Sequence, residues 1–196
     1  MLTGLILAAG AGRRYGQPKV LVRDPGGVPL VHHAMNALVL GGCDHLVVVL
    51  GAAAAEARTL VARCAVNGSI VESVIAEDWD TGQSASLRAG LAAAAGTAAQ
   101  AAVVTLVDLP DVSAAVVQRM TARFGPDSLA RAVYDGNAGH PVVLGRAHWS
   151  AIRSSSVGDA GARGYLATHQ VVSVECGDLA TGMDVDRPED FPSSRR

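Results

Sequence analysis

The sequence predicts an α/β protein with a doubly wound, mostly parallel sheet that carries helices on both faces. Up to residue 124, short apolar runs alternate with longer segments whose apolar residues recur at helical spacing, which is the rhythm of successive strand–helix units. The apolar runs are continuous, as expected for strands that are covered on both faces. The 196 residues are 49% hydrophobic, so the chain can bury a substantial core without disulfides or structural metals.

The strands and helices of this sheet can be assigned in chain order. Strands are expected over Leu2–Ala8, His45–Leu50, Ile70–Ala76 and Ala101–Val107, of which the second and fourth are continuous apolar runs. Helices are expected between and after them, over Pro29–Leu40, Ala53–Cys64, Ser84–Ala95 and Ala114–Phe124. Gly41 and Gly42 supply a stop for the first helix, and Ser113 is a suitable N-cap for the last.

The pattern changes after Gly125, where the elements become shorter. This part predicts a small antiparallel excursion and a closing helix and strand, over Leu129–Tyr134, Pro141–Leu144, Asp159–Thr168 and Val171–Glu175. Glu189 and Asp190 fit the charged first turn of a last helix that begins after Pro188. We expect one domain over residues 1–191 and a frayed tail over residues 192–196.

Composition argues against several classes of partner. A net charge of -2 gives no basic face for duplex nucleic acid, and 4% aromatic residues leave few stacking platforms for single strands. Cys43, Cys64 and Cys176 have no metal-ligand spacing, which favours reduced, buried thiols. The N-terminal apolar run lacks a basic flank and is too short for a signal peptide or a membrane span. We therefore expect a cytoplasmic protein that binds neither nucleic acid nor membrane.

A glycine-rich loop follows the first expected strand, where open α/β sheets bind ligands. It reads Leu7, Ala8, Ala9, Gly10, Ala11, Gly12, Arg13, Arg14, Tyr15, Gly16, Gln17, Pro18, Lys19. The glycines let the backbone turn and present N–H groups to an anion, and Arg14 and Lys19 add positive charge, which together suit a triphosphate. The third glycine comes one place too late for a dinucleotide-binding loop, and no Gly-Lys-Ser/Thr opens a helix as in a Walker A loop.

Three aspartates are candidate metal ligands. Asp108 ends an apolar strand, where an ionised carboxylate is costly without a partner such as Mg²⁺. An N-cap is the alternative role for Asp108, although Asp111 or Ser113 would serve better. Asp184 and Asp186 lie two residues apart, so on a strand they point to the same side.

At this point the sequence resembles a known family. The loop resembles the LAAGxGxRxGxPK signature of nucleotidyltransferases with a GT-A-like, Rossmann-related fold. Five further segments, in the same order, resemble the molybdenum cofactor cytidylyltransferase branch, also described as the molybdopterin-guanine dinucleotide synthase A-like family. They are residues 82–91, 107–110, 139–143, 158–163 and 184–191. The resemblance extends nearly end to end and implies a single Rossmann-like (GT-A-like) domain.

The resemblance also implies a reaction, in which CMP passes from CTP to the phosphate of molybdopterin and pyrophosphate leaves. Mg²⁺ would be held by Asp108 and by one of Asp184 and Asp186, with the family pattern favouring Asp186. Arg14 and Lys19 would be catalytic with Asp108, because they stabilise charge on the phosphates.

The nucleotide would be read by the loop and by the segment after the third strand. Gly82, Ser84 and Ser86 lie where related cytidylyltransferases read the base and ribose, with a helix N-cap as the alternative role for Ser84. Ala9 in place of glycine favours CTP over GTP.

The acceptor would be bound by His140, Asp159 and Arg163. Arg163 would pair with the acceptor phosphate, and His140 would donate a hydrogen bond or serve a structural role. Sugar phosphate, methylerythritol phosphate and phospholactate stay open as acceptors, and so does a non-catalytic carrier of nucleotide or cofactor. A recipient molybdoenzyme or its chaperone is the expected protein partner.

Overall fold

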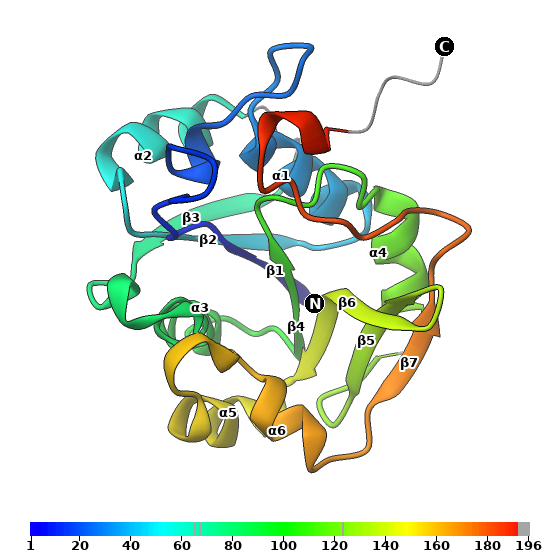
Figure 1. The fold of residues 1–196 in the computed structure, drawn as a ribbon. Coiled ribbons are helices and arrows are strands. Elements are labelled where there is room, and N and C mark those ends of the chain that lie inside the picture. Colours follow the sequence, from blue (N-terminus) through cyan, green and yellow to red (C-terminus); the bar gives the residue numbers. More distant parts are fainter. Residues whose placement is uncertain (65, 67, 123, 192–196) are drawn as a thin grey trace.

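A seven-stranded sheet forms the centre of the molecule in the computed structural model, which describes residues 1–64, 66, 68–122 and 124–191. The strands are β1 (Leu2–Leu7), β2 (His45–Leu50), β3 (Ile70–Ile75), β4 (Ala101–Leu106), β5 (Leu129–Tyr134), β6 (Asn137–Gly145) and β7 (Val172–Glu175). Their order across the sheet is β3-β2-β1-β4-β6-β5-β7 (Figure 1). The first four strands are parallel to one another, while β6 runs antiparallel to both β4 and β5.

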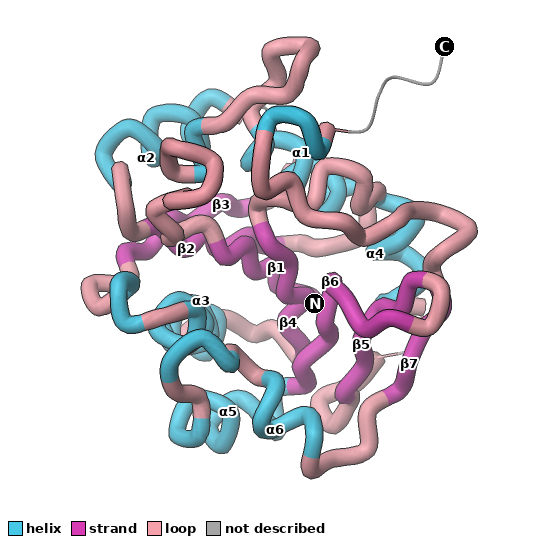
Figure 2. The backbone as a smooth tube through the Cα atoms, in the orientation of Figure 1, coloured by secondary structure: helices cyan, strands magenta, loops and turns pink. Residues whose placement is uncertain are grey.

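Helices cover both faces of this sheet (Figures 1 and 2). One face carries α1 (Leu30–Leu40), α2 (Ala54–Arg63) and α4 (Ala114–Thr121), and the other carries α3 (Gln83–Ala95), α5 (Trp149–Ser155) and α6 (Arg163–Ala167). Single 3-10 turns are η1 (Lys19–Leu21), η2 (Trp79–Thr81), η3 (Arg146–His148), η4 (Gly158–Ala160) and η5 (Pro188–Asp190). The predicted α/β class, the mostly parallel sheet and the antiparallel excursion are confirmed.

The core consists of two apolar clusters, one on each face of the sheet. Along β1, Leu2 and Ile6 belong to the cluster beneath α1 and α4, whereas Leu5 and Leu7 belong to the cluster beneath α3. Successive side chains of a strand point to opposite faces, so a strand between two helical layers must be apolar at nearly every position. This is why β1, β2 and β4 are visible in the sequence as nearly continuous apolar runs, whereas β3, at the edge of the sheet, contains Glu72 and Ser73.

Several local expectations were wrong. The helix expected over Asp159–Thr168 is broken, because Gly161 has a φ of 54° and α6 begins only at Arg163. Helix α5 was not predicted at all, because its short sequence has no N-cap signal. It is fixed by tertiary contacts: Trp149 and Ile152 are buried in the core, and Arg88 of α3 donates to the Ser156 carbonyl at its end at 2.9 Å.

Three expectations about helix ends also differ from the structure. Ser113 is the N-cap residue of α4 but makes no side-chain capping hydrogen bond. Ser84 lies inside α3, whose N-cap is Gly82. The last expected helix is the single turn η5. The tail at residues 192–196 lies outside the described residues. Within the described chain, every helix is too short or too polar to cross a membrane.

Candidate functional site

The loops after β1 and β4 lie at the point where the strand order reverses. From β1 the chain winds outward to β2 and β3, and it then returns to place β4 on the other side of β1. Loops at such a switch point diverge and leave a crevice outside the carboxyl ends of the strands. The glycine-rich loop and Asp108 therefore lie next to each other, as expected from the sequence.

The glycine-rich loop presents free backbone donors to this crevice. The N–H groups of residues 10 to 14 have no hydrogen-bond acceptor among the described residues. A tight turn follows, in which Tyr15 and Gly16 donate to the Gly12 carbonyl. Gly12 has a φ of 61°, and a Cβ there would lie 1.8 Å from the Gln17 carbonyl oxygen, so only glycine fits. A run of unpaired N–H groups is a suitable site for phosphate oxygens.

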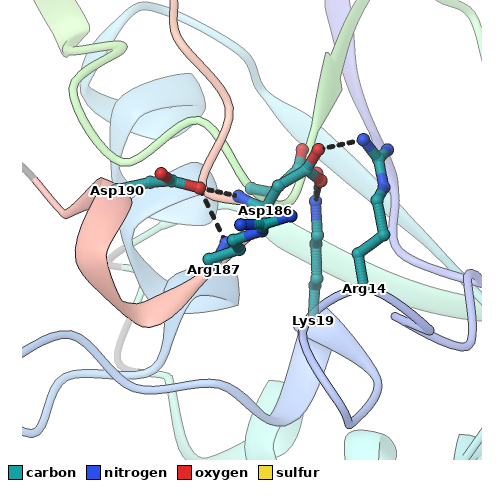
Figure 3. Close-up of polar contacts among 6 residues, drawn as sticks. Arg14, Lys19, Asp186, Arg187 and Asp190 are labelled. Carbon is teal, nitrogen blue, oxygen red and sulfur yellow. Dashed lines mark hydrogen bonds and ion pairs between the residues drawn. The ribbon is translucent and has the colours of Figure 1, made fainter.

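Lys19 joins the loop to two of the aspartates (Figure 3). Its Nζ donates to Asp108 Oδ2 at 2.6 Å and to Asp186 Oδ1 at 2.5 Å. Burial alone would lower the pKa of Lys19, but the hydrogen bonds and charges of Asp108 and Asp186 outweigh burial and raise the pKa. Arg14 forms an ion pair with the second carboxylate oxygen of Asp186. Both cations of the loop are thus held beside the carboxylates.

The C-terminal segment brings Asp186 to β4 through backbone contacts. The Val185 N–H donates to the Asp108 carbonyl at 2.9 Å, and the Val185 side chain is buried. The Asp190 carboxylate then accepts hydrogen bonds from the N–H groups of Asp186 and Arg187 at 3.0 and 2.7 Å (Figure 3). The turn at Pro188 therefore orients Asp186, a role for Asp190 that its sequence position did not predict.

Asp108, Asp184 and Asp186 form a cluster that fits a divalent cation. One carboxylate oxygen from each lies within 4.8 Å of the other two. Asp108 Oδ1 is buried and has no hydrogen-bond partner in the described part of the chain. A hard cation with oxygen ligands would satisfy that atom, and Mg²⁺ is bound through a few carboxylates together with phosphates and waters. The segment forms no strand, but Asp184 and Asp186 both face Asp108 because Val185 between them is buried.

Two cavities meet at this cluster. The first, of about 480 Å³, is lined by the glycine-rich loop, Asp108 and Asp186. The second, of about 630 Å³, includes Asp184. Leu7, Arg14, Gln83 and Leu106 line both cavities. The carboxylate cluster therefore lies at the junction between two separate binding spaces.

The first cavity contains most of the residues expected to bind nucleotide. The expected residues on its wall are Leu7, Ala8, Ala9, Gly10, Ala11, Gly12, Arg13, Arg14, Lys19, Gly82, Ser86 and Asp108. Ser84 is absent from both cavity walls; it is fully buried, and its hydroxyl accepts a hydrogen bond from the Gly161 N–H at 3.1 Å. This correction follows from helical geometry, because Ser84 and Ser86 point in different directions from α3.

Asp159 also lies elsewhere than expected. It lines the first cavity, not the second, and its Oδ1 accepts from the Gln83 N–H at 3.3 Å at the start of α3. The turn is tight, because a Cβ on Gly82, whose φ is 124°, would lie 2.5 Å from the Gly158 carbonyl. Asp159 thus satisfies a free helix donor and faces the first cavity.

The other two residues expected to bind the acceptor, His140 and Arg163, line the second cavity. Burial, with a smaller contribution from the Arg163 charge, lowers the pKa of His140 to about 4. His140 is therefore neutral at pH 7 and can offer a ligand a hydrogen bond but not a charge.

Sequence reasoning missed four polar or aromatic residues that line the cavities. Trp79 and Asp80 of η2 and Gln83 of α3 line the first cavity, and Arg131 of β5 lines the second. The turn at residues 79–83 follows the third strand, so its position at the carboxyl edge of the sheet was an available signal. Arg131 interrupts an otherwise apolar strand, which was a second available signal.

A doubly wound sheet with a phosphate-type loop and a carboxylate cluster at its switch point defines a class, that of nucleotide-binding α/β enzymes. The sequence pattern of the family described as MobA-like NTP transferase domain matches residues 4–174. The chain belongs to this family and is an enzyme of the nucleotidyltransferase group. The resemblance seen in its sequence motifs is confirmed at this level.

Similar proteins cover nearly the whole chain. Nicotine blue oxidoreductase of Paenarthrobacter nicotinovorans is 36% identical over 96% of this chain and 93% of the relative. The crystal structure of Rv0371c from Mycobacterium tuberculosis H37Rv is 27% identical, covers 97% of this chain and 95% of its own, and superposes with a TM-score of 0.76. A nucleotidyl transferase from Methanothermobacter thermautotroptrophicus shares the fold, with a TM-score of 0.77 at 19% identity, over 97% of this chain and 94% of its own.

Proposed function

We propose that this enzyme transfers CMP from CTP to the terminal phosphate of a molybdopterin-type acceptor, with release of pyrophosphate and with Mg²⁺ as the metal. The observation that carries the proposal is the junction of two cavities at Asp108, Asp184 and Asp186. One cavity offers a phosphate-binding loop and the other offers apolar walls with arginines. A transferase needs two substrates whose reacting atoms meet in one place.

The glycine-rich loop would hold the triphosphate. The free N–H groups of residues 10 to 14 would donate to its oxygens, while Lys19 and Arg14 would stabilise charge on the transferring and leaving phosphates. Trp79, Asp80 and Ser86 line the part of the cavity that remains for the base and ribose. The preference for CTP over GTP rests on Ala9 of the loop.

In the proposed reaction, the acceptor's terminal phosphate oxygen forms a bond to the α-phosphorus of CTP. The bond from that phosphorus to the β-phosphate oxygen breaks, and pyrophosphate leaves with its electron pair. A phosphate monoester is already anionic at neutral pH, so no strong general base is required. Bound Mg²⁺, held by Asp108 and Asp186 beside Asp184, would neutralise charge on the triphosphate oxygens. Catalysis would consist of positioning and charge stabilisation.

The proposal is tested by pyrophosphate release. The protein is incubated with Mg²⁺, each of CTP, GTP, ATP and UTP, and either molybdopterin or methylerythritol phosphate as acceptor, with Asp108→Ala as the control. We expect release with CTP alone and none from the variant. Release with GTP alone would reassign the nucleotide, and release only with another phosphorylated acceptor would reassign the acceptor. Binding without turnover of any nucleotide would leave a carrier and remove the enzyme proposal.

A second candidate activity is oxidoreduction, favoured by the name of the Paenarthrobacter nicotinovorans relative. The glycine spacing of the loop departs from that of dinucleotide-binding loops, which argues against a nicotinamide site here. Incubation with NADH or NADPH and nicotine blue, followed by the absorbance of the reduced nicotinamide, separates the two activities. Oxidation of the nicotinamide without pyrophosphate release in the parallel assay would replace the transferase proposal.

A further inference from the structure

Arg131 lies on the wall of the second cavity, in the middle of an apolar strand. Its neighbours on β5, Ala130 and Ala132, belong to the core cluster beneath α1 and α4. Side chains alternate along a strand, so Arg131 points to the opposite face of the sheet, where α3 and α6 lie. Its partner across the ladder is Val142 of β6, which lines the same cavity. The guanidinium thus projects from the sheet into the cavity.

The side chain of Arg131 has no partner within the described part of the chain. Its Nε is buried without a hydrogen-bond acceptor, and no carboxylate of the described residues pairs with it. By contrast, Arg146 donates to three backbone carbonyls and Arg119 pairs with Asp178. A guanidinium that is partly buried and unpaired is costly unless a ligand supplies the missing acceptor.

The remaining walls of the cavity favour a flat apolar ligand. Val104, Val142 and Leu144 of the sheet form one side, and Leu87 of α3 and Leu166 of α6 form the other. A flat ring system can lie between these two apolar surfaces.

The charges of this cavity favour a ligand that is also anionic. Arg14, Arg131 and Arg163 line the cavity together with Asp184, the only acidic side chain on the described wall; Arg14 is paired with Asp186, so Arg131 and Arg163 leave the cavity with positive charge. His140 does not add to this charge, because burial holds its pKa at about 4. The ligand that fits is therefore flat, apolar on its faces and anionic.

We propose that Arg131 is a specificity-determining residue that binds an anionic group on the ring system of the acceptor, separate from the phosphate that attacks the nucleotide. This inference rests on the proposed function, because it takes the second cavity as the acceptor site. Asp184 lines the end of the cavity at the carboxylate cluster, while Arg131 belongs to neither that cluster nor the first cavity. The acceptor is thus held at its ring and presents its phosphate at the junction.

Two pterin probes test the inference without requiring turnover. Pterin-6-carboxylate is flat and anionic, and 6-methylpterin is flat and neutral; both can be titrated by their fluorescence. We expect the wild-type protein to prefer the anionic probe. Arg131→Met should weaken binding of that probe by about ten- to a hundredfold, the range for a lost charge-assisted hydrogen bond, and leave the neutral probe unchanged. Arg131→Lys should restore part of the preference, because it retains the charge without the planar fork.

Thermal unfolding provides the structural readout. We expect Arg131→Met to keep the melting temperature or raise it, because an unpaired guanidinium is removed. A lowered melting temperature with unchanged probe preference would identify a structural residue and overturn the inference, as would a wild-type protein that binds neither probe. Pyrophosphate release is measured separately. If the wild-type protein releases no pyrophosphate but still prefers the anionic probe, and Arg131→Met removes that preference, only the proposed function is overturned.

Discussion

Lys19 occupies the position between the carboxylates where a metal ion would be bound. Its Nζ lies 2.6 Å from an oxygen of Asp108 and 2.5 Å from an oxygen of Asp186, so the positive ammonium group offsets the repulsion between the two carboxylates. A divalent cation bound by these carboxylates would compete with the ammonium group, and a displaced Lys19 would be available to the triphosphate of the proposed reaction. Lys19 and a metal ion would therefore compete for Asp108 and Asp186.

We therefore expect two opposite effects from Lys19→Met. Pyrophosphate release should fall by about 10²–10³-fold, the usual effect of removing one charged donor to the transferring group. Affinity for Mn²⁺ in the absence of nucleotide should rise, because the ammonium no longer competes for Asp108 and Asp186; calorimetric titration measures it. Unchanged Mn²⁺ affinity would show that Lys19 and the metal do not share these oxygens.

Asp190 acts on the site through Asp186. Asp190→Ala removes the acceptor for two N–H groups that hold the turn, so Asp186 should lose its orientation and activity should fall by about tenfold, the effect of roughly 1.4 kcal/mol. Glu189→Ala is the matched control, because Glu189 is exposed and lies 4.0 Å from Arg187. Equal activity of the two variants would contradict this role for Asp190.

At the scale of elements, the junction between α3 and η4 sets the shape of the first cavity. Gly82 begins α3 in a conformation that only glycine adopts readily, and Ser84 and Asp159 tie the helix to residues 158–161. Gly82→Ala should lower the free energy of unfolding by about 1–3 kcal/mol and weaken CTP binding, because η4 must move away from the new methyl group. Denaturant unfolding and nucleotide titration measure the two effects.

Gly164→Ala is the control for this prediction. Gly164 lies in α6 with open space around its Cβ position, so alanine should be neutral or stabilise the helix by up to about 1 kcal/mol. Similar losses of stability in both variants would mean that the close contact at Gly82 is not what requires glycine.

The same elements show what sequence reasoning could predict. Strands β1, β2 and β4 were predicted to within a residue or two, because each is apolar on both faces. Helix α5 and the break at Gly161 were not, because they depend on contacts with residues distant in sequence, such as the bonds from Arg88 to the Ser156 carbonyl at the end of α5 and from the Gly161 N–H to Ser84. Short elements have few local hydrogen bonds, so tertiary packing decides their limits.

For the site, the sequence predicted what lies on loops at the carboxyl edge of the sheet. Gly12, Lys19 and Asp108 carry recognisable spacing, and the topology brings them together. Arg131 and Asp159 were missed or misplaced because their roles depend on which face of a strand, or which end of a helix, meets a distant loop. Local patterns do not contain that information.

For the whole molecule, the half-buried His140 makes stability depend on pH. The pKa of His140 is about 4 in the folded protein and 6.5 in the unfolded chain. Between these values the unfolded chain binds more protons, so the free energy of unfolding falls as the pH drops from 6.5 toward 4. The loss attributable to this residue is at most about 3 kcal/mol. Asp24, whose pKa is lowered below 3.8, adds a loss only at still lower pH.

His140→Gln isolates this contribution, because glutamine retains a side-chain hydrogen-bonding group without titrating. Denaturant unfolding of both proteins at a series of pH values between 7 and 4.5 measures it. We expect the wild-type protein to lose stability steeply over this range and the variant to lose less, with the two curves diverging as the pH falls. Parallel curves would mean that His140 becomes protonated in the folded state, and its side chain would then reach solvent through the second cavity.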